Sequence, residues 1–262
     1  MAVVEVEYPA EGVGRIVLNR PECLNALNFE LVGALHDALD DIAANDACKA
    51  VILTGKGRGF CSGLDLKDWG PLPAVGEHRH RRAGSTGQSF ISSLTTHLQE
   101  TPQIIIAAVN GLAYGGGLAL SLACDLRFAS RSASFCSAFI RTGLTGTDIG
   151  ISYFLPRLIG ASRAFDLMVT GRTIAADEAL SMGLVSQLFD EQSLSEHALA
   201  VAQGIAGYTA VGLRMTKEAM WANLNAPDLA SCLALENRNQ DLAGQTDEVQ
   251  QYMRNYRERF SK

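Results

Sequence analysis

Apolar runs of two different periods divide the first part of the chain into short strands and helices. Val3–Tyr8 and Gly14–Leu18 are rich in β-branched residues, and the turn-forming stretch Pro9–Gly12 between them predicts a hairpin. From Phe29 to about Ala44, leucines and isoleucines recur at helical spacing, and Asn28 in front of them is a typical helix N-cap. We therefore expect a hairpin followed by an amphipathic helix.

Two buried strands, Ala50–Leu53 and Ile104–Val109, are each followed by a glycine-rich loop. The loops cover Gly55–Gly63 and Asn110–Gly117, while Pro71–Gly87 lacks periodicity and predicts an irregular surface segment. Further elements are predicted as helices over Ser89–Gln99 and from Gly117 to about Ala123, and as strands over Leu126–Ala129 and Ser134–Cys136. Buried strands that alternate with helices are typical of an α/β fold with parallel strands.

The remainder of the chain, after about Ala161, is predicted to be mainly helical. One strand-like run, Leu184–Phe189, interrupts it, and the long stretch Leu229–Phe260 is amphipathic. We expect an α/β core over residues 1–200 and a helical C-terminal region over residues 201–262. The helical region is expected to pack on its own core or on a neighbouring subunit.

Composition and charge exclude several classes of protein. Hydrophobic residues make up 47% of the chain and charged residues 19%, which is typical of a globular protein and not of disorder. A formal net charge of −6 makes nucleic acid an improbable partner. No apolar run reaches the roughly 18 residues of a membrane span, and Met1–Glu5 does not resemble a signal peptide. The six cysteines are scattered without a C-x-x-C pair, so reduced thiols in a cytoplasmic protein are expected.

The two glycine-rich loops are the strongest candidates for chemistry. Arg58–Leu66 follows one buried strand, and Gly111–Gly117 follows the other and opens a helix. Glycines let a ligand approach backbone N–H groups closely, and a helix N-terminus favours negative charge. Each loop alone is typical of a tight turn, but two of them facing each other can direct two N–H donors at one developing oxyanion. Gly55-Lys56-Gly57 lacks the P-loop spacing, and no G-x-S-x-G is present.

Ordered motifs along essentially the whole chain resemble the crotonase (enoyl-CoA hydratase/isomerase) superfamily. The matching stretches are Ile16–Pro21, Leu24–Leu27, Ser62–Leu66, Ala108–Gly111, Gly115–Gly117, Ala123–Arg127, Leu155–Gly160, Thr170–Thr173, Glu178–Ala179 and Gly183–Val185. The resemblance implies a crotonase-like spiral of ββα units with a C-terminal helical region. It also implies an acyl-CoA thioester substrate, a place in fatty acid metabolism, and assembly as a homotrimer or a dimer of trimers.

The same resemblance assigns roles to individual residues. The N–H groups of the oxyanion hole fall on Leu64 and Gly116. The coenzyme A contacts fall on Ala26, in the matching stretch Leu24–Leu27, and on the first glycine-rich loop. The loop residues are Arg58, Phe60, Ser62, Gly63 and Leu66. Because the oxyanion hole polarises the thioester, no metal and no redox cofactor are implied.

The chain departs from the family hydratases at their two catalytic glutamates. Those positions fall on Ala119 and Phe139, and neither side chain can move a proton. In the dienoyl-CoA isomerase branch a catalytic aspartate matches Asp148, which alternatively caps a helix that starts near Gly150. Double-bond isomerisation through Asp148 is therefore favoured over standard hydration. The alternatives are acyl-CoA hydrolysis, C–C cleavage, or a catalytically silent acyl-CoA-binding subunit, with Ala119 and Phe139 lining the substrate site in each case.

Other polar residues have weaker functional interpretations. Asp65 and Asp68 are expected to be a helix cap and a solvated acid, and Asp125 is expected to be structural. The basic segment around His78 and His80, which also contains Arg79, Arg81 and Arg82, is more typical of a mobile loop than of a metal site, because no acid or cysteine lies nearby. That segment and Lys217 are candidate partners for the phosphates of coenzyme A, with a solvated lysine as the alternative.

Overall fold

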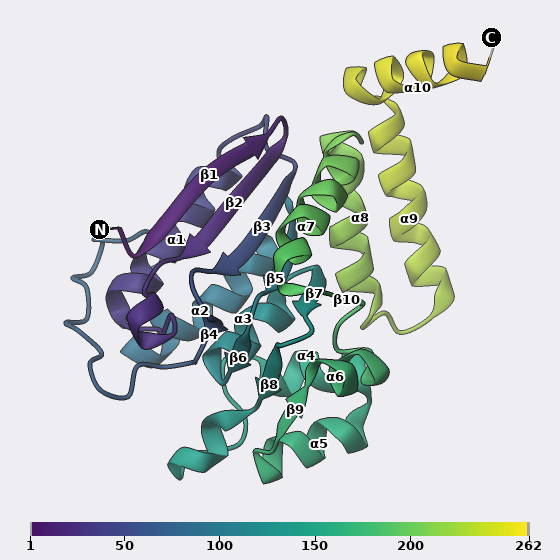
Figure 1. The fold of residues 1–262 in the computed structure, drawn as a ribbon. Coiled ribbons are helices and arrows are strands. Elements are labelled where there is room, and N and C mark those ends of the chain that lie inside the picture. The colour runs from purple at the N-terminus through teal and green to yellow at the C-terminus, as the bar shows by residue number, and fades with distance from the viewer. Residues whose placement is uncertain (1, 261–262) are drawn as a thin grey trace.

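Two β-sheets lie at the centre of the molecule in the computed structural model, which describes residues 2–260 (Figure 1). The larger sheet has the order β1 (Val4–Ala10), β2 (Val13–Leu18), β3 (Ala50–Gly55), β5 (Ile104–Val109), β7 (Leu126–Ser130) and β10 (Gln187–Phe189). The smaller sheet has the order β4 (Gly59–Cys61), β6 (Leu112–Tyr114), β8 (Ser134–Cys136) and β9 (Thr173–Ala175). Only the β1–β2 and β8–β9 pairs are antiparallel among these.

From β3 to β8, successive strands alternate between the two sheets, which makes this part of the chain a spiral. In each turn, one strand joins the larger sheet, the next joins the smaller sheet, and a helix follows. The turns are β3–β4–α2 (Gly87–Glu100), β5–β6–α3 (Gly116–Ala123) and β7–β8 with the 3-10 helix η2 (Ala138–Thr142). The predicted α/β fold of ββα units is confirmed. The three-residue strands β4, β6 and β9 were not predicted, because segments so short have no measurable period.

The inner strands β3 and β5 of the larger sheet bury both faces, because helices cover each of them, whereas the edge strand β1 is largely exposed (Figure 1). Val51 and Leu53 point to the face covered by α1 (Phe29–Ala43), α2 and α3. Ala50 and Ile52, in alternation, point to the face covered by α7 (Glu191–Ala206). Alternate residues of a strand face opposite sides of a sheet, so a continuous apolar run is what a strand covered on both sides requires.

The predicted start of the chain is confirmed. β1 and β2 pair as a hairpin, and the Asn28 side chain accepts a hydrogen bond of 2.9 Å from the N–H of Leu31 at the start of α1. The remaining elements are the 3-10 helix η1 (Pro21–Cys23) and the helices α4 (Ile151–Ile159), α5 (Ala161–Thr170) and α6 (Ala176–Met182). Among residues 2–260, no helix is long and apolar enough to cross a membrane.

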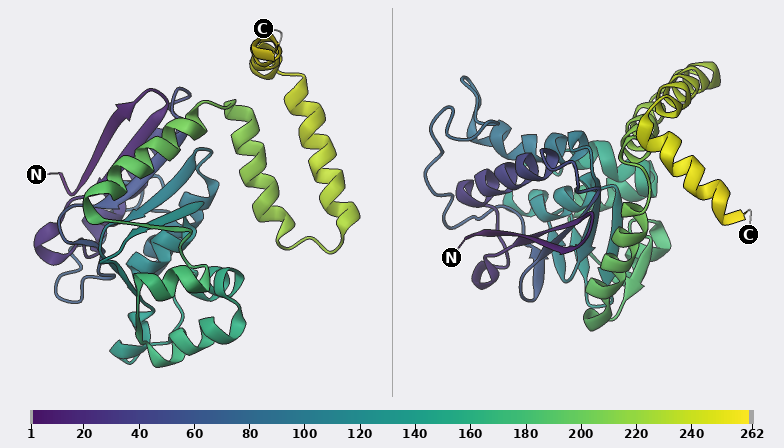
Figure 2. Two further views of the ribbon diagram at one scale, coloured as in Figure 1. Left: turned by 45° about the vertical axis from the view of Figure 1, so that its right-hand side comes forward. Right: turned by 90° about the horizontal axis from the view of Figure 1, so that it is seen from above.

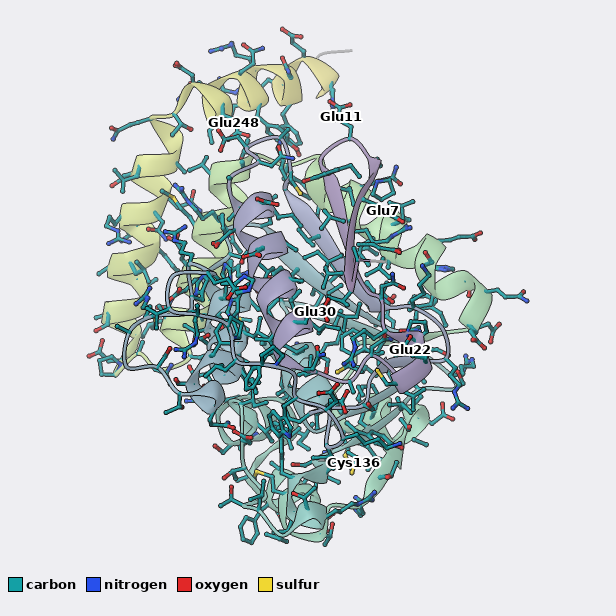
Figure 3. The ribbon with its side chains drawn as sticks, turned by 90° about the vertical axis from the view of Figure 1, so that its left-hand side faces the viewer. Glu7, Glu11, Glu22, Glu30, Cys136 and Glu248 are labelled. Carbon is teal, nitrogen blue, oxygen red and sulfur yellow. The ribbon has the colours of Figure 1, made fainter. Side chains whose placement is uncertain are left out.

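The C-terminal helices extend away from the sheets (Figure 2). They are α8 (Ala210–Asn223), α9 (Leu229–Gly244) and α10 (Asp247–Phe260), so the predicted amphipathic stretch is two helices and not one. The expected boundary at residue 200 lies inside α7, which packs on the sheet through Leu194, Ala198 and Ala202. Glu248 of α10, labelled in Figure 3, accepts a 2.8 Å hydrogen bond from the N–H of Ala210 and so joins α10 to the start of α8.

Lys217 of α8 is a correction to the sequence prediction, because it is buried and not solvated. Its ammonium lies 2.9 Å from the carboxylate of Asp125 and donates to the carbonyls of Leu98 and Gln103. Only 4% of its side chain is exposed. The ammonium is therefore committed to holding α8 against the core and is not available to a phosphate of the same chain, while the structural role expected of Asp125 is confirmed.

Replacing Lys217 by Met is expected to lower the free energy of unfolding by about 3–5 kcal/mol, because it leaves the Asp125 carboxylate buried without its counter-charge. Chemical denaturation followed by circular dichroism measures the change. The double variant Lys217→Met with Asp125→Asn should lose less, since no charge is then left buried. Lys67→Met, at an exposed position, is the matched control. Equal stability of Lys217→Met and wild type would contradict this account.

Candidate active site

The two glycine-rich loops meet at one end of the smaller sheet. Leu64, in the first loop, pairs in a parallel bridge with Leu27. The N–H of Leu27 donates to Gly63 over 2.7 Å, and its carbonyl accepts from Asp65 over 2.9 Å. In such a bridge Gly63 and Asp65, the neighbours of Leu64, form both hydrogen bonds with Leu27, so the N–H of Leu64 points away from Leu27.

Glycine at position 63 is what lets the loops approach so closely. Its φ of +96° is disfavoured for other residues. A Cβ there would lie 2.8 Å from the carbonyl oxygen of Tyr114 and 3.3 Å from the nitrogen of Gly116. Gly117 is equally restricted, because its Cβ would overlap the carbonyl of Cys61. The contact between the loops is thus backbone against backbone, with no side chain between them.

The N–H groups of Leu64 and Gly116 are both uncommitted. Within residues 2–260, neither donates to a protein acceptor, and Gly116 is the first residue of α3. The first N–H groups of a helix have no partner inside the helix and lie at the positive end of its dipole. The two predicted donors therefore lie on neighbouring backbone segments and can serve a bound anion or a developing oxyanion.

Two apolar side chains, Ala119 and Phe139, stand at the positions where the resemblance to the family hydratases would place catalytic carboxylates. We call these two residues the apolar wall. Ala119 lies in α3 and is fully buried. Phe139 lies in η2, is 6% exposed, and its ring reaches within 3.6 Å of the position of a Cβ on Gly115. Neither residue supplies an acid or a base, and the Phe139 ring fills the space beside the second loop.

Asp148 is the first acidic residue after Phe139 in the chain. It is half-buried, and its Oδ1 accepts 2.6 Å and 2.8 Å hydrogen bonds from the Gln88 amide and from the N–H of Ile149. The next side chain, Ile149, reaches within 3.4 Å of the position of a Cβ on Gly116. In the described part of the chain Asp148 forms no ion pair, and its Oδ2 has no hydrogen-bond donor. One oxygen is held while the other remains free to take a proton.

Burial raises the pKa of Asp148 above its ordinary value, and the two hydrogen bonds from Ile149 and Gln88 oppose this effect in part. A raised pKa shifts a carboxylate toward the range in which it both accepts and returns protons. The backbone beside it is strained, because Ile149 has a φ of +47°, which is rare for a β-branched residue. Such strain is found at functional sites, where surrounding contacts hold it.

The alternative role of Asp148 as a helix cap is wrong. The N-cap of α4 is Gly150, where no side chain caps the helix. The only backbone N–H that donates to the Asp148 carboxylate is that of Ile149, which precedes the helix. The Asp148 side chain therefore does not satisfy the unpaired N–H groups at the start of α4.

Asp65, the other acid close to Leu64, is already occupied. Its carboxylate lies 3.0 Å from the Arg20 guanidinium and accepts from the N–H groups of Lys67 and Asp68. Burial alone raises its pKa, but these bonds together hold the pKa below its ordinary value. No helix follows it, so the expectation of a helix cap is wrong, and Asp65 instead closes a turn and pairs with Arg20. Asp68 is exposed, as expected, and bonds to the N–H of Gly70.

The predicted coenzyme A contacts differ widely in exposure. Arg58 and Leu66 are exposed on the first loop, and Leu66 shows 68% of its surface. Ser62 is half-buried and donates to the carbonyl of Cys23, while Ala26 and Gly63 are buried beside it. Phe60 is completely buried in the core. It supports the loop from behind and offers no surface to a ligand.

The basic segment between the first loop and α2 docks on α1. His78 lies 2.9 Å from the Asp37 carboxylate, and its ring occupies the space left by Gly33, where a Cβ would overlap it. Arg81 is buried and donates to backbone carbonyls within the segment. The segment was expected to be a mobile basic loop, but His78 and Arg81 have partners within the chain, whereas Arg82 is exposed.

The spiral of ββα units, with paired backbone donors at its glycine loops, defines the crotonase class of fold. The chain belongs to the enoyl-CoA hydratase/isomerase family, whose model matches residues 9–262. It is 40% identical, over 92% of this chain and 84% of the relative, to the "Probable enoyl-CoA hydratase echA12" of Mycobacterium bovis. It is 35% identical to the "1,2-epoxyphenylacetyl-CoA isomerase" of Escherichia coli, over 92% and 90% of the two chains.

Solved structures agree with the fold. The crystal structure of a probable enoyl-CoA hydratase/isomerase from Mycobacterium abscessus superposes with a TM-score of 0.88 at 37% identity, over 99% of this chain and 97% of the other. A monofunctional enoyl CoA isomerase from M. smegmatis superposes with a TM-score of 0.75 at 36% identity, over 89% and 99%. The relatives thus include both hydratase and isomerase names, so similarity alone leaves the reaction open.

Proposed function

We propose that this protein isomerises a double bond of an acyl-CoA thioester, with Asp148 as its single acid–base group. The observation that carries the proposal is the state of the carboxylates around the loops. Asp65 is paired with Arg20, the two hydratase positions hold Ala119 and Phe139, and Asp148 alone is unpaired with a raised pKa. Hydration needs an acid and a base to handle water, whereas isomerisation needs one group that moves a proton between two carbons.

The proposed reaction begins with a 3-enoyl thioester whose carbonyl oxygen accepts from the N–H groups of Leu64 and Gly116. The Asp148 carboxylate removes a proton from C2, and the electron pair moves into the carbonyl to give a dienolate. Two preorganised donors stabilise this oxyanion more than they stabilise the neutral carbonyl, which lowers the barrier. Asp148 then returns the proton to C4, which leaves the double bond between C2 and C3. No water or cofactor is consumed.

The apolar wall supports this scheme in a second way. Phe139 and Ala119 keep water away from the dienolate, and a site that excludes water strengthens each remaining electrostatic interaction.

The exposed face of the first loop, with Arg58 and Leu66, is the proposed contact for coenzyme A, where a guanidinium can pair with a phosphate. As in related folds, we propose a homotrimer or dimer of trimers. The protruding helices α8 and α9 leave Leu224, Leu229 and Leu233 exposed, as an interface between copies would require.

A panel of 2-enoyl-, 3-enoyl- and dienoyl-CoA esters tests the proposal. We expect products of unchanged mass with a shifted double bond, read by mass spectrometry and by ultraviolet absorbance of the conjugated thioester. Products heavier by one water would replace isomerisation with hydration, and release of free coenzyme A would indicate hydrolysis. Tight binding of every ester without turnover would mean a silent acyl-CoA-binding subunit, the second class of function that Ala119 and Phe139 allow.

A further inference from the structure

Three of the five histidines in the chain gather far from the glycine loops, between α1, α2 and the basic segment. His36 comes from α1, His97 from α2, and His80 from the basic segment, and one ring nitrogen of each lies within 4.8 Å of those of the other two. The rings stack, with centroids 4.4 Å apart for His36 and His80 and 4.0 Å apart for His80 and His97. The cluster is thus a packed interface between three segments that are distant in sequence.

The hydrogen bonds fix where the protons of this cluster lie. His36 Nε2 lies 3.1 Å from the Ser93 hydroxyl and 3.3 Å from the carbonyl oxygen of Phe90. The Ser93 hydroxyl donates its own proton to that carbonyl over 2.7 Å, so Nε2 faces two acceptors and carries a proton. In a neutral imidazole the other nitrogen, Nδ1, is then an acceptor. It lies 2.9 Å from His97 Nδ1, which must therefore donate to it.

This arrangement leaves the second nitrogen of His97 as a lone pair that faces an acid. His97 Nε2 lies 3.4 Å from Oδ1 of Asp40, on the α1 turn that follows His36. His80 Nε2 lies 3.6 Å from the same oxygen and is shielded from solvent without a hydrogen-bond partner. The His97 lone pair and the Asp40 carboxylate oxygen are both acceptors, and such a pair repels unless a cation or a proton lies between them. Arg79, 3.6 Å from the same oxygen, is largely exposed, and such a pair contributes little.

We propose that His80 Nε2, His97 Nε2 and Asp40 Oδ1 bind one divalent transition-metal ion of the zinc class. Ligands about 2.0–2.2 Å from a tetrahedral Zn²⁺ lie roughly 3.3–3.6 Å apart, which matches both nitrogen–oxygen distances of this cluster. Two imidazoles and one carboxylate are a ligand set that zinc prefers. The third edge, between His80 Nε2 and His97 Nε2, is longer in this structure, so binding requires His80, the least buried of the three rings, to move toward His97 together with its segment.

His36 is a positioning residue in this site. It accepts from the Nδ1–H of His97 and so directs the other nitrogen of that ring at the metal, the arrangement in which ligand histidines are ordinarily held. The metal would join α1, α2 and the basic segment at one point. That segment leads directly into α2, where Gln88 holds Asp148, so the ion would stabilise the scaffold of the active site without taking part in its chemistry.

The test is a calorimetric titration of the full-length protein, freed of metal by dialysis against a chelator, with Zn²⁺. We expect one site per chain in the wild type and at least a 100-fold loss of affinity in Asp40→Asn and His80→Gln. Asp41→Asn, the next acid on α1, and His197→Gln, the histidine on α7, are matched controls that should bind like the wild type. Substitutions at Asp40 and His80 replace partly exposed side chains, and circular dichroism verifies that the variants are folded.

A second readout follows the basic segment itself. Zn²⁺ should slow cleavage by trypsin after Arg79 and Arg82 in the wild type and in Asp41→Asn, but not in Asp40→Asn. The proposal is overturned if Zn²⁺ does not bind, or if it binds equally well to the wild type, Asp40→Asn and His80→Gln. It does not depend on the proposed isomerase activity, because neither measurement uses a thioester.

Discussion

Replacing Asp148 by Asn is expected to lower turnover of the best substrate in the ester panel by about 10²–10⁴-fold, the usual contribution of one acid–base group. Asn has the same shape and keeps a carbonyl oxygen in place of Oδ1, so the bonds from Gln88 and from the N–H of Ile149 can persist. Binding of a saturated acyl-CoA, measured by calorimetry, should therefore stay within about twofold of the wild type, since the change removes a proton carrier and no contact with the thioester.

The pH dependence of the wild type provides an independent check on the same group. Asp148 must begin the reaction as a carboxylate, so kcat/KM should fall as the pH drops through the raised pKa of this residue. The acidic limb should disappear from the residual activity of Asp148→Asn. Asp177→Asn, an exposed acid on α6, is the matched control and should turn over normally. Wild-type turnover in Asp148→Asn would remove Asp148 from the mechanism and favour another reaction on this fold.

The fold and the meeting of the two glycine-rich loops could be predicted because their signals are local, while the assignment of the donors to Leu64 and Gly116 came from resemblance. Strands such as Ala50–Leu53 are continuously apolar, and Gly63 and Gly115–Gly117 follow matching strands, so the convergence of the loops follows from parallel pairing. The catalytic role of Asp148 is a different matter. It came from resemblance, and the structure adds that its carboxylate is unpaired and does not cap α4. Its role in turnover stays a prediction.

What could not be predicted depends on contacts between distant segments. Lys217 has the sequence surroundings of a solvated lysine, and only the fold brings Asp125 to it. His80 lies far from Asp40 and His97 in the sequence, and these two residues reach it only after the basic segment docks on α1. In both cases the residue type occurs in exposed as well as buried environments. Which environment it has here depends on a partner that is distant in the sequence, so no local pattern predicts it.

Replacing Gly63 by Ala is expected to lower kcat by at least about 10²-fold, the usual loss when one oxyanion donor is removed. The added Cβ would lie 2.8 Å from the Tyr114 carbonyl and 3.3 Å from the nitrogen of Gly116. Both atoms belong to the backbone, so neither can rotate aside as a side chain would, and the two loops must separate. The N–H groups of Leu64 and Gly116 would then no longer converge on one oxygen, although each remains present.

The positive φ of Gly63 carries a second cost, and a control variant isolates it. Gly76 has a similar φ, +85°, but a Cβ there would meet nothing within 4 Å, so Gly76→Ala imposes the strain of about 1–2 kcal/mol without the contact. Gly63→Ala should lose more stability than Gly76→Ala in thermal unfolding, because the backbone contact adds to the strain, and only Gly63→Ala should lose activity. A transition-state-like enolate analogue should also bind more weakly to Gly63→Ala by the factor lost in kcat/KM, because the hole acts on the oxyanion. Equal activity of the two variants would mean that the loops do not have to touch for catalysis, and the paired donors would lose their assigned role.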